Sequence, residues 1–325
     1  MSASDVAIHA RGVAKSYGKV QALRGLDLTV PKGVVYGLLG PNGSGKTTAV
    51  KCLTTLVRFD SGTARVCGFD VAAEPEKVRN RIGLTGQYAA VDELLTGREN
   101  LVMFGKLAGF HSRYARTFAG ELLERFDLVE AADRPVGQYS GGMRRRVDLA
   151  LSMLHTPEVL VLDEPTTGLD PQSRNQVWSA VRELIDGGTT VLLTTQYLEE
   201  ADQLAARIAV LQAGAVIAEG TADELKAQTG GDQITVVVRT PDEVSAAAQI
   251  VGRASSGTPQ VAPHERRISA PVTDRTATLA HVLRELEQAG IRVEDIGIRR
   301  PTLDEVFLSL TDRKNAKSQT EVVSS

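Results

Sequence analysis

The chain contains 325 residues, which is enough for one large domain or for two of ordinary size. Hydrophobic residues make up 42% and charged residues 24%, the composition of a folded globular protein. The net charge of −3 offers no basic excess, which argues against DNA or RNA as the main partner. No apolar run approaches the ~20 residues of a membrane-spanning helix, so we expect any link to a membrane to run through another protein.

The N-terminal residues and the two cysteines favour a cytosolic location. The first residues include the acidic Asp5 and no apolar core, so a secretory signal is not expected. Cys52 and Cys67 lack metal-ligand spacing and are expected to stay reduced and to serve packing.

Short β-rich runs alternate with longer helical patterns over residues 1–230. A strand is expected over 34–39, running into a glycine-rich loop, with a helix over 47–57. The apolar runs 159–163 and 190–194 have the length and composition of buried strands. Strand–helix alternation of this kind predicts an α/β domain with a largely parallel sheet. Residues 92–126 carry helical periodicity and few β-branched residues, which indicates a helical insert at about 88–145.

A second pattern begins after the polar, glycine-rich sequence QTGGDQ that follows Ala227 and is typical of a linker. Over residues 231–312 the expected order is β-α-β-β-α-β, which predicts a small α+β domain of ferredoxin-like type. Its expected elements are a strand at 234–240, a helix at 242–251, two short strands within 260–271, a helix at 276–289 and a strand at 293–298. A closing helix is expected at 302–310, and the polar tail 313–325 is expected to be disordered.

The sequence GPNGSGKTT fits the phosphate-binding pattern GxxxxGK[ST] at Gly40, Gly45, Lys46 and Thr47. Glycines let backbone N–H groups turn inward around phosphate oxygens, and the following helix points its positive end at them. Lys46 can reach the β- and γ-phosphates, and the Thr47 hydroxyl can bind Mg²⁺. An unrelated glycine-rich turn is the alternative, but the strand before and the helix after favour a phosphate loop.

The apolar run 159–163 ends in two acids, within the sequence VLVLDEP. Asp163 is suited to hold Mg²⁺, and Glu164 is suited to polarise an attacking water. An acidic strand end is common and by itself indicates only a turn. A phosphate loop earlier in the same α/β domain favours the catalytic interpretation.

The sequence YSGGMRRR at 139–146 predicts another helix end that can bind an anion. Ser140 can cap a helix that begins at Gly141. One phosphate loop already serves one nucleotide, so this helix end would face the nucleotide of another copy. The alternatives are an ordinary Ser-capped helix and, for Arg144–Arg146, a nucleic-acid patch. We favour a solvated or phosphate-proximal helix face for these arginines.

These motifs, in this order, resemble those of the nucleotide-binding subunits of ATP-binding-cassette (ABC) transporters, over about residues 6–225. The resemblance implies a P-loop NTPase fold with a helical subdomain, and ATP and Mg²⁺ as cofactors. The residues that it implies for nucleotide contact are Tyr17, stacking on adenine; the Walker A loop Gly40, Pro41, Asn42, Gly43, Ser44, Gly45, Lys46, Thr47 and Thr48; Gln87; the signature residues Ser140, Gly141, Gly142 and Met143; and Asp170, in a loop that crosses the dimer interface.

The resemblance also implies roles in metal binding and catalysis. Thr47, Gln87 and Asp163 would hold Mg²⁺, with Gln87 also reporting to the membrane subunit. Glu164 would be the catalytic base, assisted by Lys46 and by Gln196.

Two residues depart from the general family pattern. Met143 stands where the signature usually has Gln, and Gln196 stands where most members have a His that contacts the γ-phosphate. Gln keeps an N–H donor but cannot take up a proton, so hydrolysis is expected to be slower or differently coupled.

Four sequences together resemble the daunorubicin/doxorubicin-resistance type of ATP-binding subunit: TGQYAAVDELLTG, YSGGMRRR, TTQYLEEADQLA and RRPTLDEVFLSLT. This narrower resemblance extends through the C-terminal domain to about Thr311. It implies ATP-driven export of an antibiotic or drug-like compound through a separate integral membrane permease. The active form would be a homodimer with ATP at its interface, on the cytoplasmic face of the cell membrane.

Two other functions compete with this interpretation. A soluble cassette ATPase acting on ribosomes or DNA usually has two cassettes or a long coiled-coil insert, and this chain has one cassette and no such heptad run. An ATP-binding regulator without hydrolysis would be expected to lack one of Lys46, Asp163 and Glu164, all of which are present.

Overall fold

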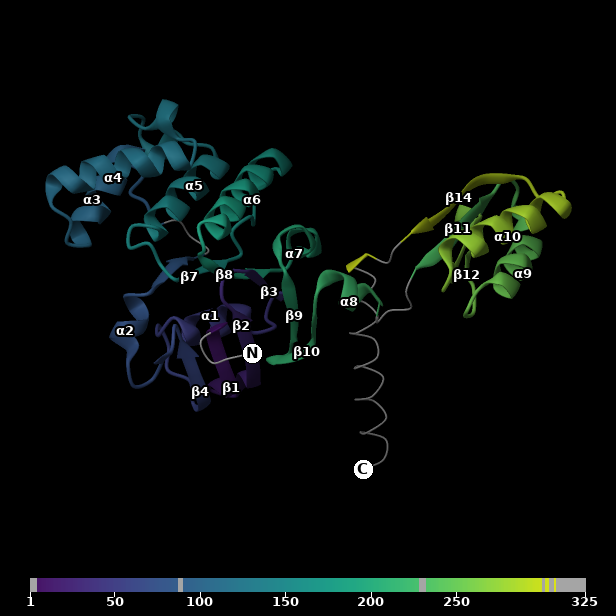
Figure 1. The fold of residues 1–325 in the computed structure, drawn as a ribbon, viewed down its shortest axis with the longest axis horizontal. Coiled ribbons are helices and arrows are strands. Elements are labelled where there is room, and N and C mark those ends of the chain that lie inside the picture. The colour runs from purple at the N-terminus through teal and green to yellow at the C-terminus, as the bar shows by residue number, and fades with distance from the viewer. Residues whose placement is uncertain (1–4, 87–89, 228–231, 300–301, 304–306, 308–325) are drawn as a thin grey trace. The chain divides into compact units, whose positions relative to one another are not determined.

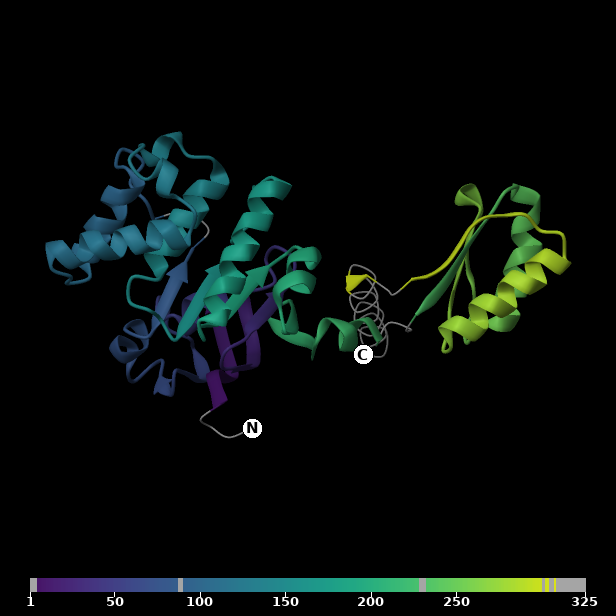
Figure 2. The same ribbon diagram turned by 45° about the horizontal axis from the view of Figure 1, so that its top comes forward.

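The computed structural model describes residues 5–86, 90–227, 232–299, 302–303 and 307 (Figures 1 and 2). Contacts between Cα atoms divide the chain into two compact units, Met1–Thr221 and Ala222–Ser325, and each is described by itself. None of the described helices is long and apolar enough to cross a membrane.

A six-stranded sheet forms the centre of the first unit. Its strand order is β10 (Ala215–Gly220), β9 (Arg207–Gln212), β3 (Val35–Leu39), β8 (Thr190–Thr195), β7 (Val159–Asp163) and β6 (Ile82–Thr85). All neighbours pair in parallel except β9 and β10, so the predicted largely parallel sheet is confirmed. Every residue of β3, β7 and β8 is buried, which explains their continuous apolar sequences.

The two faces of this sheet bury different hydrophobic cores. Val159 and Val161 of β7 belong to one core, and Leu160 and Leu162 belong to the other, because successive strand side chains point to opposite faces. The first core contains α1 (Lys46–Leu53), which contacts strands of both this sheet and a second one. The second core is shared with the helices α3 (Gly97–Leu107), α4 (Ser112–Arg125), α5 (Gly141–Ser152) and α6 (Pro171–Asp186). The helices expected within 92–126 are therefore confirmed as α3 and α4, which pack side by side.

The second sheet of this unit is antiparallel, with the order β2 (Val20–Pro31), β1 (Val6–Tyr17), β4 (Ser61–Val66) and β5 (Phe69–Asp70). None of its strands was expected from the sequence. Register shifts interrupt the alternation of β1, as between Ala10 and Val13, where Gly12 has a φ of 59°. Short helices α2 (Pro75–Arg79) and α7 (Leu198–Leu204) complete the unit.

Helix α1 is shorter than the sequence predicted, ending at Leu53 instead of continuing to Val57. Thr54 turns its hydroxyl back to donate to the Val50 carbonyl at 2.8 Å. Thr55 then adopts a φ of 66°, a left-handed conformation that cannot continue an α-helix.

The second unit has a separate core between one sheet and two helices. After α8 (Ala222–Ala227), its sheet has the order β12 (Gln260–Ala262), β13 (Arg267–Pro271), β11 (Gln233–Val238) and β14 (Val293–Arg299), all antiparallel. Helices α9 (Val244–Ala254) and α10 (Arg275–Gln288) share the core with the sheet. The β-α-β-β-α-β order confirms the predicted ferredoxin-like fold. Of the expected closing helix only Thr302, Leu303 and Phe307 are described, and the tail 313–325 lies outside the described residues.

Candidate functional site

The phosphate loop connects β3 to α1, and glycine is needed in it where φ is positive or where a Cβ would clash with the backbone. Gly43 and Gly45 have φ values of 77° and 112°. A Cβ at Gly45 would lie 2.6 Å from the Ala22 carbonyl oxygen, and a Cβ at Gly40 would lie 2.4 Å from the Leu211 carbonyl oxygen. Side chains at Gly40 and Gly45 would therefore displace the surrounding backbone, which accounts for the spacing of the motif.

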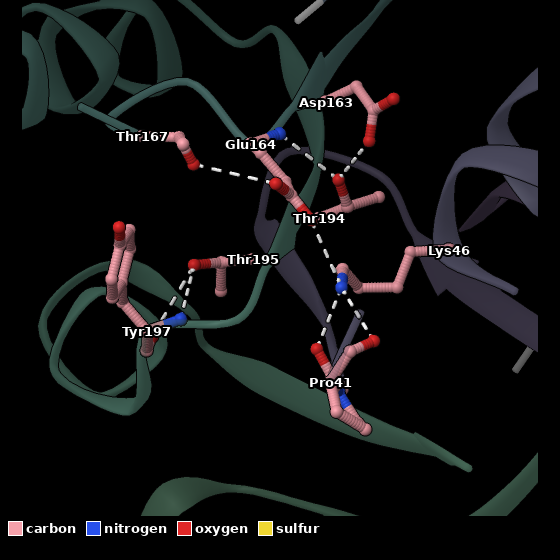
Figure 3. A network of polar contacts seen from close by, with 9 residues as sticks. Pro41, Lys46, Asp163, Glu164, Thr167, Thr194, Thr195 and Tyr197 are labelled. Carbon is pink, nitrogen blue, oxygen red and sulfur yellow. Dashed lines mark hydrogen bonds and ion pairs between the residues drawn. The ribbon is translucent and has the colours of Figure 1, made fainter. Parts of the chain in front are cut away.

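Lys46 links the loop to the end of β7. Its ammonium Nζ donates to the carbonyl oxygens of Gly40 at 2.7 Å and Pro41 at 3.1 Å (Figure 3). It also lies 3.0 Å from Oε1 of Glu164, and the two side chains are only 3% and 9% exposed. The structure therefore brings these two predicted site residues into direct contact.

The turn after β7 sets the direction of the two acidic side chains. Asp163 Oδ1 accepts from the Thr194 hydroxyl at 2.5 Å, and Thr194 in turn accepts from the Glu164 amide (Figure 3). Glu164 has a φ of 52°, which is unfavourable by about 1–2 kcal/mol for a residue with a Cβ. Strained backbone of this kind is characteristic of functional sites, because the surrounding structure must hold it in place.

An open groove of about 520 Å³ runs along the phosphate loop. Its lining residues come from β2, the phosphate loop, α1, the Glu164 turn and the β9–β10 turn: Val20, Gln21, Ala22, Arg24, Asn42, Gly43, Gly45, Lys46, Thr47, Thr48, Glu164, Ala213 and Gly214. The Gly214 amide donates to Ser44 and its carbonyl accepts from Arg24, so these segments are joined directly.

The groove has the donors that a nucleotide with a bound cation needs. The Ser44 hydroxyl is buried and finds no hydrogen-bond partner among the residues that the structure describes. The position of a Cβ on Gly43 is open, so the loop backbone there is accessible. Thr47 lines the groove, and the buried Asp163 ends β7 directly before the lining residue Glu164. They carry a hydroxyl and a carboxylate, the oxygen ligands that Mg²⁺ takes together with phosphate oxygens. The residues present therefore fit a magnesium nucleotide.

Tyr17 ends β1 at the hairpin that leads into β2. Its register partner is Val20, a lining residue of the groove, and its own side chain is 48% exposed. Lys15 Nζ lies 5.6 Å from the centre of the ring. Tyr17 therefore lies beside the groove with a face open to solvent.

The predicted signature residues form the start of α5, away from the lining of the groove. Ser140 caps the helix by accepting from the Met143 amide at 3.2 Å, which confirms the predicted cap. A Cβ on Gly142 would lie 2.7 Å from Ser173 Cβ, so the start of α5 packs closely on the start of α6. Asp170 caps α6, and its hydrogen bonds from the Ser173 hydroxyl and amide lower the pKa of this carboxyl.

Arg144–Arg146 were expected to form a solvated or phosphate-proximal helix face, and this prediction is wrong for two of the three arginines. Arg145 and Arg146 are each 7% exposed. Arg146 donates to the carbonyl oxygens of Phe126 and Asp127, which excludes it from a basic surface patch. The sequence did not reveal the burial of Arg145 and Arg146, because three consecutive arginines on a short helix look the same in sequence whether their side chains are buried or exposed.

Gln196 follows β8 directly and is half-buried, outside the lining of the groove. Gln87 lies outside the described residues, so its predicted contacts stay a prediction.

A buried acid, Glu200 in α7, was not expected from the sequence, and it is fully inaccessible to solvent. Its Oε1 accepts from the Thr166 hydroxyl at 2.8 Å and from Trp178 Nε1 at 3.1 Å. Burial raises the pKa of Glu200, and the nearby hydroxyls and the Trp178 N–H oppose that rise. Glu200 thus connects the turn after Glu164 to the helix that follows Gln196. No sequence signal separates it from its neighbour Glu199, which is exposed.

Comparisons with known proteins agree with this geometry. A sequence profile of the family described as ABC transporter matches residues 23–167. A profile described as the C-terminal domain of DrrA1-3-like ATP-binding proteins matches residues 220–311. The fold is similar to a dimeric ATP-binding cassette solved in a post-hydrolysis state with ADP and phosphate. That match has a TM-score of 0.60 at 26% identity and covers 66% of this chain and 98% of that one.

Two relatives match almost the whole chain. The daunorubicin resistance ATP-binding protein DrrA2 of Streptomyces coeruleorubidus is 58% identical, over 96% of this chain and 97% of its own length. The daunorubicin/doxorubicin resistance ATP-binding protein DrrA of Streptomyces peucetius is 50% identical, over 97% of this chain and 95% of its own length. Because both units of the fold and the groove residues are covered by these matches, the chain belongs to the ABC transporter family, in the group of the daunorubicin/doxorubicin resistance ATP-binding proteins.

Proposed function

We propose that this chain is the ATP-binding and ATP-hydrolysing subunit of an exporter that drives efflux of an antibiotic or drug-like compound through a separate membrane permease. The observation that supports it most is the buried contact between Lys46 and Glu164, which brings the phosphate loop and the end of β7 into one groove. The resistance function in the names of the relatives supports the class of cargo.

ATP would lie along the groove with its phosphates against the loop. The Ser44 hydroxyl, the loop amides and Lys46 would bind phosphate oxygens, and Tyr17 would stack on the adenine. Thr47, Asp163 and Gln87 would hold Mg²⁺, which when bound neutralises phosphate charge.

Lys46 changes partners in the proposed reaction. In this structure its ammonium is held by two carbonyls and by Glu164. A γ-phosphate carries more negative charge than a carbonyl, so we expect Lys46 to turn toward it and to release the Glu164 carboxylate. Glu164 would then accept a proton from the attacking water, with the Gln196 amide donating to the γ-phosphate.

The active form is proposed to be a homodimer. Ser140–Met143 lie away from the groove of their own chain, although the exposed start of α5 can bind an anion. Pairing two copies head to tail would place each helix start, with Asp170 nearby, against the nucleotide of the other copy. This pair would dock beneath the permease on the cytoplasmic face of the membrane, without nucleic acid. The C-terminal unit would contribute to pairing or coupling.

Two variants test the ATPase. Glu164→Gln is expected to bind ATP as the parent does while losing turnover, and to accumulate as an ATP-dependent dimer in size-exclusion chromatography. Lys46→Ala is expected to weaken nucleotide binding itself. A Glu164→Gln protein that hydrolyses ATP at the parent rate would refute Glu164 as the base.

Co-purification tests the transport role. An exporter subunit is expected to bring a multi-spanning membrane protein with it from the producing cell, and ATP-dependent efflux should require both. Recovery of ribosomes or DNA instead would favour the soluble alternative.

A further inference from the structure

Three consecutive arginines on α5 make contacts in three different parts of the first unit. Arg144 is the outermost, with Nη1 2.9 Å from the exposed Glu93 carboxylate. Arg146 donates to the carbonyl oxygens of Phe126 and Asp127, which directly follow α4. Arg145, between them, points to the strand that carries Asp163.

Arg145 connects three backbone segments through one guanidinium. Its Nη1 donates to the Gly86 carbonyl at 2.6 Å, and its Nη2 donates to the Asp163 carbonyl at 3.3 Å. Nη1 also lies 3.2 Å from Oδ2 of Asp148, one helical turn further along α5. The other oxygen of Asp148 accepts from the Ala90 amide at 3.0 Å. The pair thereby joins α5 to Gly86, to Ala90 and to the end of β7.

Arg145 and Asp148 are charged side chains that are both buried, and a buried charge is unfavourable unless it is paired and hydrogen-bonded. Arg145 is 7% exposed and Asp148 is 4% exposed, so each needs the other to balance its charge. A planar guanidinium presents five N–H donors in a rigid fork, so Arg145 can hold two carbonyls and a carboxylate from different segments in one fixed geometry. One of these carbonyls belongs to Asp163, a predicted Mg²⁺ ligand. The other belongs to Gly86, which directly precedes the predicted ligand Gln87 in the sequence.

We propose that Arg145 and Asp148 form a positioning pair for the Mg²⁺ site, holding the backbone at Gly86, Ala90 and Asp163 in a fixed relation. The inference rests on the proposed ATPase function. Neither side chain would touch nucleotide or metal. Both act through the backbone of the segments that they join.

The test compares Arg145→Gln with Arg144→Gln and Arg146→Gln in the full-length chain. The first readout is the Mg²⁺ concentration that gives half-maximal ATPase activity at fixed ATP. The second is the rise in melting temperature caused by ATP, measured with Mg²⁺ and again with EDTA. Mutation of Arg146, a buried arginine that contacts neither Gly86 nor Asp163, controls for a purely structural loss.

We expect Arg145→Gln to raise the required Mg²⁺ about fivefold or more, the effect of losing one or two buried hydrogen bonds. Its stabilisation by ATP in EDTA should match that of the parent, while the added stabilisation by Mg²⁺ shrinks. Arg146→Gln should lower the melting temperature without changing the Mg²⁺ requirement, and Arg144→Gln should change neither. Equal Mg²⁺ requirements in Arg145→Gln and the parent, or an equal shift in Arg146→Gln, would overturn the proposal.

A second substitution separates charge burial from positioning. Removing Arg145 alone leaves Asp148 buried and unpaired, so adding Asp148→Asn to Arg145→Gln should recover melting temperature. It should not recover the Mg²⁺ requirement, because the two carbonyls still lack their donor. Recovery of both would assign the pair to stability alone and refute positioning. A parent protein without Mg²⁺-dependent ATPase activity would instead refute the proposed function.

Discussion

At the scale of single residues, the site depends on conformations that residue identity alone does not specify. Glu164 adopts a left-handed backbone that a Gly would take more easily, and its amide donates to both the carbonyl and the hydroxyl of Thr194. This conformation directs its carboxylate at Lys46. The strand-end pair Asp163–Glu164 is therefore arranged by a residue on the neighbouring strand.

The substitution Gln196→His tests whether an imidazole can replace the Gln196 amide as the N–H donor in ATP hydrolysis. His also offers an N–H donor, and Glu164 remains the base, so ATPase activity is expected to be retained or raised. Steady-state turnover at saturating ATP is the measurement. Complete loss of turnover with ATP binding intact would contradict this prediction.

The substitution Glu200→Gln tests the buried acid through pH. Burial raises the pKa of Glu200 in the folded protein, so its contribution to stability is present below the unfolded pKa and is lost as pH rises through the folded pKa. Gln has no proton to lose and can keep the contacts of Oε1. The free energy of unfolding of Glu200→Gln, relative to the parent, should therefore increase across that window and then level off.

Urea unfolding at a series of pH values, starting near 4.5, would measure this difference. Glu199→Gln, at the exposed neighbouring position, is the matched control for the loss of a glutamate from α7. A relative stability of Glu200→Gln that stays constant or falls with rising pH would contradict the assigned burial effect.

At the scale of helices and strands, the sequence predicted those elements that one local pattern specifies. The fully buried strands β3, β7 and β8 appear as apolar runs, and the phosphate loop and the Ser140 cap appear as short motifs with fixed spacing. The antiparallel sheet around β1 was missed because its bulges break the alternation that identifies a strand. The inward direction of Arg145 was missed because it depends on which helix face meets β7.

The contact between α5 and α6 gives a prediction about glycine. Gly142→Ala would place a Cβ 2.7 Å from Ser173 Cβ and force the two helix starts apart. We expect a loss of about 1–3 kcal/mol in the free energy of unfolding, together with reduced ATPase activity. Gly120→Ala in α4 is the control, since a Cβ there meets nothing within 4 Å and should stabilise the protein by roughly 0.5–1 kcal/mol. Equal effects of the two substitutions would refute the close packing of α5 on α6.

At the scale of the whole molecule, we propose that each chain contributes one half to each of two nucleotide sites. The groove beside Lys46 is proposed to receive the phosphates, and the start of α5 at Ser140 lies outside that groove. In a two-fold dimer each complete site would take its phosphate loop from one copy and its signature from the other. A chain that loses either half should therefore be inactive alone but complementary to a chain that loses the other half.

Mixing Lys46→Ala with Ser140→Arg chains tests this claim most directly. Each variant alone is expected to show no significant ATPase activity, because every dimer then has two damaged sites. In an equal mixture half of the dimers are mixed and carry one intact site, so roughly a quarter of the parent activity should return. No recovery on mixing, or full activity of Ser140→Arg alone, would contradict a site shared between two copies.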